Sequence, residues 1–185
     1  VNGCRAEDAV LVTITPSTLT AEAGAGSAVC AGGGSSVAIG GAPTAQGGSA
    51  PYTYAWSPSA TLSSATSANP VATPIATTKY FVTVTDGKGC VAIDSVTITV
   101  NPVPVACAGP DTAICSGAKV YLGCLQTATG GTSPYTYLWS NGSTSTNPLV
   151  GVTNTTIFTV TVTDANGCTG TDSKLVTVNQ NPNAD

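Results

Sequence analysis

The chain has 185 residues, of which only 8% are charged, and its formal net charge is -4 at pH 7. Its five Lys and Arg residues form no basic patch, so the electrostatic term that drives nucleic-acid binding is missing. No apolar run approaches the ~20 residues that a membrane-spanning helix requires. The chain contains no His, so it lacks an imidazole base and the commonest metal ligand. These features exclude a nucleic-acid-binding protein and a membrane span, and they leave no cofactor site to expect.

A long motif occurs twice in the chain. The stretch from Pro51 to Cys90 contains Pro-Tyr-Thr-Tyr, Trp-Ser, Val-Thr-Val-Thr-Asp and Gly-Cys, and the stretch from Pro134 to Cys168 contains them again in the same order. The last part occurs a third time at residues 2–14. Such repetition indicates tandem structural units. We place one unit at residues 17–102 and one at residues 103–180, preceded by the terminal strand of another unit at residues 1–16 and followed by a tail or linker at residues 181–185.

Short runs of alternating β-branched residues predict an all-β fold, because alternation with a period of two is typical of strands. Asp-Gly-Lys-Gly at residues 86–89 and Asp-Ala-Asn-Gly at residues 164–167 predict tight hairpin turns. With one opening strand after each linker, each unit has about seven strands, as in a β-sandwich. The strands are expected at residues 36–40, 52–57, 71–76, 78–85 and 91–100, and at residues 119–123, 135–140, 149–153, 157–163 and 171–178.

One Trp occupies the same place in each unit, at Trp56 and Trp139. Alternation along the strand puts the Tyr residues that precede each Trp on the same face. An aromatic row on an exposed sheet would stack on sugar rings, but a single Trp at a fixed place favours a plug between two sheets. We therefore expect both Trp side chains in the core.

The cysteines follow the repeat. Cys30 and Cys90 align with Cys115 and Cys168, which predicts one disulfide within each unit. This density of disulfides indicates an oxidising, extracellular location. A metal site is not expected, because the chain has no His and no Cys-x-x-Cys sequence.

The three remaining cysteines depart from this scheme. Cys107 and Cys124 align with Glu22 and Gly41, and their joint absence from the first unit predicts that they bond to each other. Cys4 aligns with the last cysteine of each unit, so we expect it to be unpaired or to bond to a segment of a preceding unit that this chain does not contain, and a bond between chains is the alternative.

The acidic residues offer little chemistry. Four Asp residues flank the two predicted hairpins, where such side chains usually cap turns. A weak calcium site is the alternative, although the six to eight oxygen ligands of such a site are not visible in the sequence. No Ser has a plausible activating base, so catalysis is the least supported function. The four residues are Asp86, Asp94, Asp164 and Asp172.

The motifs resemble those of PKD-like and SprB-type repeats of large Bacteroidetes surface proteins. Ile-Cys-Ser-Gly at residues 114–117, Gly-Gly-Thr-Ser-Pro-Tyr-Thr-Tyr-Leu-Trp-Ser at residues 130–140 and the segment from Thr159 to Cys168 carry the resemblance. It implies immunoglobulin-like β-sandwiches in a cell-surface adhesin, filament or stalk, and it brings no catalytic residues. The pair Cys107 and Cys124 departs from the common pattern.

Short acceptor sequences for glycans follow from that context. Asp-Ser-Val and Asp-Thr-Ala are similar to the O-glycosylation acceptor of Bacteroidetes, and two sequons fit Asn-linked glycans. Glycans would help a weakly charged surface to stay soluble, so we expect a secreted glycoprotein. The candidate acceptors are Ser95, Thr112, Asn141 and Asn154.

The sequence therefore predicts a non-enzymatic structural segment of an extracellular repeat protein, without cofactors, whose partners are neighbouring repeats or copies of the same protein. One alternative is a binding module for a surface polysaccharide or a protein, through the loops at residues 42–50 and 125–133. A second alternative is a filament subunit that polymerises by donating the strand at residues 1–16 to a neighbouring sheet.

Overall fold

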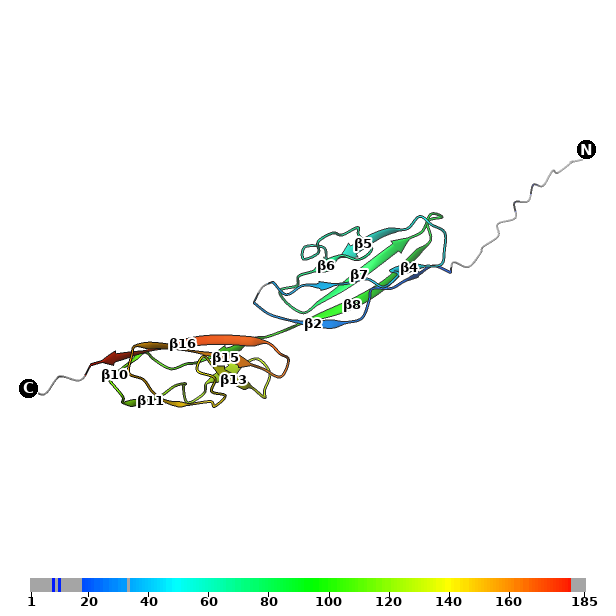
Figure 1. Ribbon diagram of the computed structural model, residues 1–185. Helices are drawn as coiled ribbons and strands as arrows, with labels where there is room; N and C mark the ends of the chain where they lie inside the picture. Colours follow the sequence, from blue (N-terminus) through cyan, green and yellow to red (C-terminus); the bar gives the residue numbers. More distant parts are fainter. Residues whose placement is uncertain (1–7, 9, 11–17, 33, 181–185) are drawn as a thin grey trace, which may run out of the picture. The chain divides into compact units, whose positions relative to one another are not determined.

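The computed structural model describes residues 8, 10, 18–32 and 34–180, and every regular element in this part of the chain is a β-strand (Figure 1). Within these residues, no helix has the length and apolar character to cross a membrane. Strand pairing separates the strands into two sets, which we call the first repeat (β1–β8) and the second repeat (β9–β16).

The first repeat contains β1 (Thr20–Ala21), β2 (Ser27–Cys30), β3 (Val37–Ala38), β4 (Ala45–Gln46), β5 (Thr53–Ser57), β6 (Val71–Ala72), β7 (Thr78–Thr85) and β8 (Val91–Asn101). Four of these strands form a sheet in the order β2-β8-β7-β5, and two strand pairs, β1-β4 and β3-β6, complete the repeat. The long strands β7 and β8 lie at the centre of the larger sheet (Figure 1).

The second repeat contains β9 (Pro104–Ala106), β10 (Thr112–Cys115), β11 (Lys119–Tyr121), β12 (Ala128–Gly130), β13 (Thr136–Trp139), β14 (Leu149–Gly151), β15 (Thr156–Thr163) and β16 (Thr169–Asn179). Its four-stranded sheet has the order β10-β16-β15-β13, and β9-β12 and β11-β14 form the two pairs. The two repeats therefore have the same topology, strand for strand.

In both repeats the first strand of the four-stranded sheet pairs in parallel with the last strand. β2 pairs with β8 so that Cys30 lies opposite Asn101, and β10 pairs with β16 so that Cys115 lies opposite Asn179. The pairs β1-β4, β5-β7, β9-β12, β11-β14, β13-β15 and β15-β16 are antiparallel, as expected for hairpins and neighbouring short strands. In each sheet the strand at one edge, β2 or β10, therefore runs in the same direction as the last strand of its repeat.

Alternation along the central strands builds the core. In β15, the side chains of Phe158, Val160 and Val162 are buried, while the residues between them are partly exposed. They pack with Trp139 from β13 and with Val176 from β16, together with residues beside β11 and in β12, so the core lies between the large sheet and the two strand pairs. Burying each such Val contributes roughly 1.5–3 kcal/mol to folding.

Most predicted long strands are found where the alternation places them. β7 has the predicted bounds, and β8, β15 and β16 differ from the prediction by one or two residues at an end. The structure has eight strands in each repeat within the described residues, against about seven expected, because β1 and β4 contain only two residues each and carry no alternation.

The boundary between the units is defined differently by pairing and by proximity. In the described residues, no strand of β1–β8 pairs with a strand of β9–β16. By proximity, Gly26–Val37 and Ala72–Lys79 group with the residues from Thr97 onward in one compact unit. The boundary at residues 102 and 103 therefore stays a prediction. The predicted strand at residues 1–16, with Cys4, and the tail at residues 181–185 lie outside the described residues, apart from residues 8 and 10.

Candidate functional site: cysteines and carboxylate turns at the strand ends

A buried carboxylate organises the turn before the last strand of each repeat. In the second repeat, Asp164 Oδ1 accepts hydrogen bonds from the backbone N–H groups of Asn166 and Cys168, at 2.9 Å each, and Oδ2 accepts from the N–H of Thr132 at 2.9 Å. Only 5% of the Asp164 side chain is exposed. The carboxylate therefore ties the turn to the loop that precedes β13.

Asp86 repeats this arrangement in the first repeat. Its Oδ1 accepts from the N–H groups of Lys88 at 2.9 Å and Cys90 at 2.8 Å, and its Oδ2 accepts from Ser49 N–H at 3.0 Å. Burial by itself would raise the pKa of each carboxyl group, but the three backbone hydrogen bonds outweigh it, so the pKa of Asp86 and that of Asp164 lie below the ordinary value of 3.8. Lys88 adds a favourable charge at Asp86.

The lowered pKa values predict a loss of stability in acid. Because the folded state holds both carboxyl groups ionised, their stabilising effect is present above pH ~4 and is lost as the pH falls through the lowered pKa values. We expect the melting temperature of the wild type to fall steeply below pH ~4. The double variant Asp86→Asn with Asp164→Asn should melt at a lower temperature at pH 6 and should show a flatter acid profile. Asp8→Asn is the control, and a steep profile in the double variant would contradict the assignment.

The other two acidic candidates also act on the backbone. Asp94 Oδ2 accepts from Ala23 N–H at 2.7 Å, and Asp172 Oδ2 accepts from Ala108 N–H at 2.8 Å. Each carboxylate joins the last strand of its repeat to the chain near the start of that repeat. No group of three or more acidic or Cys side chains within the described residues is arranged to hold a metal ion. The structure thus gives these aspartates a role in folding, and it offers nothing in support of the calcium alternative.

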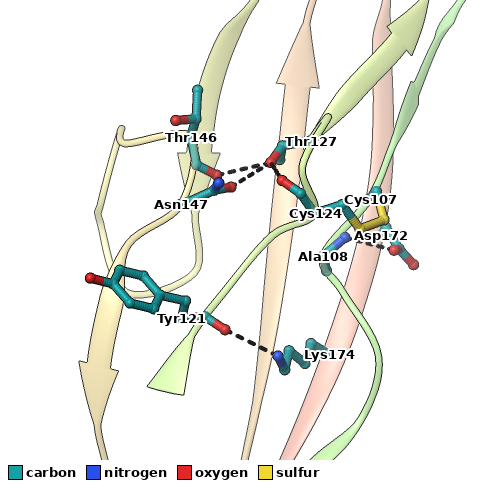
Figure 2. The surroundings of a disulfide bond; sticks show 9 residues. All are labelled: Cys107, Ala108, Tyr121, Cys124, Thr127, Thr146, Asn147, Asp172 and Lys174. Atoms are coloured by element: carbon teal, nitrogen blue, oxygen red, sulfur yellow. Dashed lines mark hydrogen bonds between the residues drawn. A yellow bond between two sulfur atoms is a disulfide. The ribbon is translucent and has the colours of Figure 1, made fainter. Parts of the chain in front are cut away.

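Cys107 and Cys124 form a disulfide with a Cα–Cα distance of 5.8 Å, which is the pairing predicted from their joint absence in the first repeat. Figure 2 shows the bond beside Asp172 and Ala108, close to Thr127. The hydroxyl group of Thr127 lies 2.7 Å from Asn147 Oδ1 and 3.1 Å from the carbonyl oxygen of Thr146. The disulfide therefore joins the residues after β9 to the loop before β12, and the hydrogen bonds of Asp172 and Thr127 hold these two segments as well.

The first repeat fills the same space without sulfur. There the side chain of Glu22 occupies the space that a side chain at Gly41 would need. Glu22 Oε1 also accepts a hydrogen bond from Gly24 N–H at 3.1 Å. The same place in the fold is thus occupied by Glu22 and Gly41 in the first repeat and by the Cys107–Cys124 disulfide in the second.

The two disulfides predicted within the units, Cys30–Cys90 and Cys115–Cys168, are not formed. Instead Cys30, the last residue of β2, is bonded to Cys168, which precedes β16, with a Cα–Cα distance of 5.6 Å. Cys90 and Cys115 are free. Because β2 belongs to the first repeat and β16 to the second, this bond links the two repeats covalently, 138 residues apart in the sequence.

The parallel pairing of the first strand explains why the predicted pairs cannot form. Cys30 lies opposite Asn101 at the end of β8, whereas Cys90 precedes the start of the same strand. β8 has 11 residues, so its two ends are on the order of 35 Å apart. A disulfide requires Cα atoms about 4.4–6.8 Å apart. Cys115 and Cys168 are separated in the same way by β16.

Both Trp side chains are buried, in agreement with a core position. Trp56 is 4% exposed and Trp139 is 1% exposed, so neither ring presents a face for stacking on a sugar. The indole Nε1–H of Trp56 donates to the carbonyl oxygen of Ser67, and that of Trp139 to the carbonyl oxygen of Ser145, both at 2.9 Å. The polar end of each ring is therefore satisfied inside the fold.

The four candidate glycan acceptors are exposed or partly exposed. Asn141 and Asn154 are exposed, and Ser95 and Thr112 are partly exposed on β8 and β10.

The loops at residues 42–50 and 125–133, considered for ligand binding, each contain a buried Thr. The hydroxyl group of Thr44 donates to the carbonyl oxygen of Ala68, and that of Thr127 donates to the carbonyl oxygen of Thr146.

Two hollows on the surface of the described residues are lined by uncharged side chains. One of about 360 Å³ on the second repeat is lined by Leu138, Trp139, Ser140, Gly142, Thr159 and Thr161. Another of about 290 Å³ lies beside Cys30 and is lined by glycines, Ser35 and the segment from Thr73 to Ile75. Their linings contain no acid–base pair of the kind that catalysis requires.

Comparison with known proteins agrees with the repeat structure. The family model for the SprB repeat matches residues 44–61 and 127–144. Each matched segment begins at the buried Thr of its repeat and extends past the strand that carries the buried Trp. None of the curated proteins matches the chain significantly.

Solved structures of immunoglobulin domains are similar to the chain. The N-terminal eight immunoglobulin domains of Down syndrome cell adhesion molecule have 14% identity and a TM-score of 0.58, covering 88% of this chain and 24% of that one. Titin domains I67–I69 have 11% identity and a TM-score of 0.43, covering 86% and 64%. The insect immune protein hemolin has 18% identity and a TM-score of 0.43, covering 85% and 46%. The chain spans about a quarter of the first of these solved chains and less than two thirds of the second. At this identity the first similarity establishes the fold alone, which is that of immunoglobulin-like β-sandwiches, and the two family matches show that each repeat is similar to the SprB repeat over its matched segment.

Proposed function

We propose that the chain is a mechanical segment of an extracellular repeat protein, an adhesin stalk or surface filament, that provides reach and resists pulling and proteolysis. SprB repeats and immunoglobulin-like sandwiches are typically non-catalytic structural modules, and SprB repeats come from cell-surface proteins. Disulfides persist in oxidising surroundings, which fits an extracellular location.

The Cys30–Cys168 bond is the observation that supports a mechanical role most strongly. It closes a covalent loop with a sequence separation of 138 residues. A force that pulls the two ends of the chain apart extends the segments before Cys30 and after Cys168. Between these two residues the force passes through the disulfide bond, so the residues inside the loop carry no load. The enclosed parts of both repeats cannot lengthen under force, even if they unfold.

The parallel strand pairs would resist pulling if the Cys30–Cys168 bond were reduced. β10 lies near the start of the second repeat and β16 ends it, and both run in the same direction. Without the bond, pulling the start of the second repeat backwards and its end forwards loads the hydrogen bonds between β10 and β16 along the strands, so that the four paired positions resist together. The pair β2-β8 has the same arrangement in the first repeat.

Single-molecule pulling between handles at residues 1 and 185 tests this function. The variant Cys30→Ser with Cys168→Ser should reach a final extension roughly 430 Å longer than the wild type, at up to ~3.6 Å per released residue, with Cys107–Cys124 still closed. Cys107→Ser with Cys124→Ser is the matched control, because that bond lies inside the large loop and its loss should leave the extension unchanged. Equal final extensions of the wild type and the first variant would contradict the proposal.

A further inference from the structure

The Cys30–Cys168 bond uses two kinds of backbone position, and within the described part of the chain each kind occurs once more at another cysteine. One is the end of the first strand of the four-stranded sheet, which we call the strand-end position. The other is the residue that closes the carboxylate turn, which we call the turn position. In the second repeat the strand-end position is Cys115, and in the first repeat the turn position is Cys90.

The strand-end positions match in register and in hydrogen bonding. Cys30 lies opposite Asn101, and Cys115 lies opposite Asn179, the last residue of the last strand in each repeat. The N–H group of the following residue donates to the carbonyl oxygen of that Asn, at 2.8 Å in the first repeat and 3.0 Å in the second. The backbone that presents Cys30 to its partner is therefore reproduced at Cys115.

The turn positions match equally well. The N–H of Cys168 donates to Asp164 Oδ1 at 2.9 Å, and the N–H of Cys90 donates to Asp86 Oδ1 at 2.8 Å. In return the carbonyl oxygen of each Cys accepts from the N–H of the same Asp, at 2.9 and 3.0 Å. The backbone of Cys90 is thus held by the same hydrogen bonds as the backbone of Cys168, which is bonded to Cys30.

Both unused positions are accessible to a partner. The side chain of Cys115 is exposed and that of Cys90 is partly exposed, and neither is bonded to another cysteine. Cys168, which has a partner, is only 1% exposed. Cys90 is thus more exposed than Cys168, as expected if the residue that would bond to Cys90 and cover it is missing.

We propose that Cys115 and Cys90 are the two halves of a second joint of the same kind, each forming a disulfide with the complementary cysteine of another repeat of this type. In a solution of this chain alone, that repeat belongs to a second copy, and Cys115 of one copy bonds to Cys90 of the next. The two halves differ, so the contact is heterologous and leaves a free cysteine at each end, and the linking continues from copy to copy.

The chemistry needs an oxidant. Two thiols lose two protons and two electrons when the sulfur–sulfur bond forms, and a disulfide oxidant such as oxidised glutathione accepts them and is released as two thiols.

The inference rests on the proposed function only in taking other repeats as the partners of Cys90 and Cys115. The pulling experiment uses one chain and involves neither Cys90 nor Cys115, so a failure of the joint would leave its result unaffected.

The test uses the full chain with Cys4→Ser, because Gly3-Cys4 has the sequence of a turn position and would compete with Cys90. In a glutathione redox buffer, non-reducing electrophoresis should show a ladder of dimers and longer species that collapses with thiol. Mass spectrometry of the dimer should identify a Cys90–Cys115 peptide. Adding either Cys115→Ser or Cys90→Ser should abolish the ladder, and mixing these two variants should restore dimers only.

A variant in which the thiol of Cys115 is moved to another exposed position distinguishes a specific Cys90–Cys115 bond from disulfides that form by random collision. The variant Cys115→Ser with Asn141→Cys places a cysteine at another exposed position of the second repeat and should form no dimers. Dimers from this variant as fast as from the parent would overturn the proposal. So would predominant Cys115–Cys115 or Cys90–Cys90 links, a Cys90–Cys115 bond within one chain, or monomers under all conditions.

Discussion

Trp139→Ala is expected to lower the free energy of unfolding of the second repeat by about 3–5 kcal/mol, the cost of removing a large buried aromatic side chain. Trp139 is 1% exposed and packs against Phe158, Val160 and Val176. Its loss would leave a cavity between the sheets and remove the hydrogen bond to the carbonyl oxygen of Ser145. Hydrogen exchange of the Val160 and Val162 amides measures the effect without relying on indole fluorescence.

The neighbouring residue provides the matched control for this substitution. Leu138 is 57% exposed on the opposite face of the same strand, so Leu138→Ala should change stability by no more than about 0.5 kcal/mol. Trp139→Phe should fall between the two, because it keeps a ring but leaves part of the volume empty. Equal effects of Trp139→Ala and Leu138→Ala would contradict the position of Trp139 in the core.

Replacing both Cys107 and Cys124 with Ser is expected to lower the free energy of unfolding of the second repeat by about 3 kcal/mol, because the bond closes a loop with a sequence separation of 17 residues. The hydrogen bonds around Thr127 and Asp172 remain in the variant (Figure 2). The loss should therefore appear as reduced stability of a fold that still forms. Denaturant unfolding followed by circular dichroism, with hydrogen exchange to assign the affected repeat, measures it.

The first repeat controls for this substitution because it lacks the bond. Its equivalent residues are Glu22 and Gly41, so the protection of β7 and β8 amides should be the same in the wild type and in the double variant. Loss of protection in the first repeat, or an unchanged second repeat, would show that the bond does not act locally.

The sequence predicts the fold well where side-chain alternation is long. The runs at residues 78–85 and 157–163 alternate over seven or eight residues, and burial of every second side chain then fixes both the strand and its inward face. The same alternation places Trp56 and Trp139 inward. The two-residue strands β1 and β4 are too short to show a period, so only the structure reveals them.

The cysteine pairing could not be obtained from the repeat alignment. A bond within each repeat and a bond from one repeat to the next both place one cysteine at the strand end and one at the turn of every repeat. The two schemes differ only in the direction of the first strand, because antiparallel or parallel pairing with the last strand decides at which end of the sheet Cys30 lies. Side-chain alternation carries no information about that direction.

The covalent bond between the repeats is tested most directly by a disulfide map of the oxidised chain. Digestion with pepsin under non-reducing conditions suits the few Lys and Arg residues, and its low pH suppresses thiol exchange because thiolate is scarce. Mass spectrometry should find peptides that join Cys30 to Cys168 and Cys107 to Cys124. Peptides that join Cys30 to Cys90 and Cys115 to Cys168 in their place would contradict the linkage and the mechanical role that rests on it.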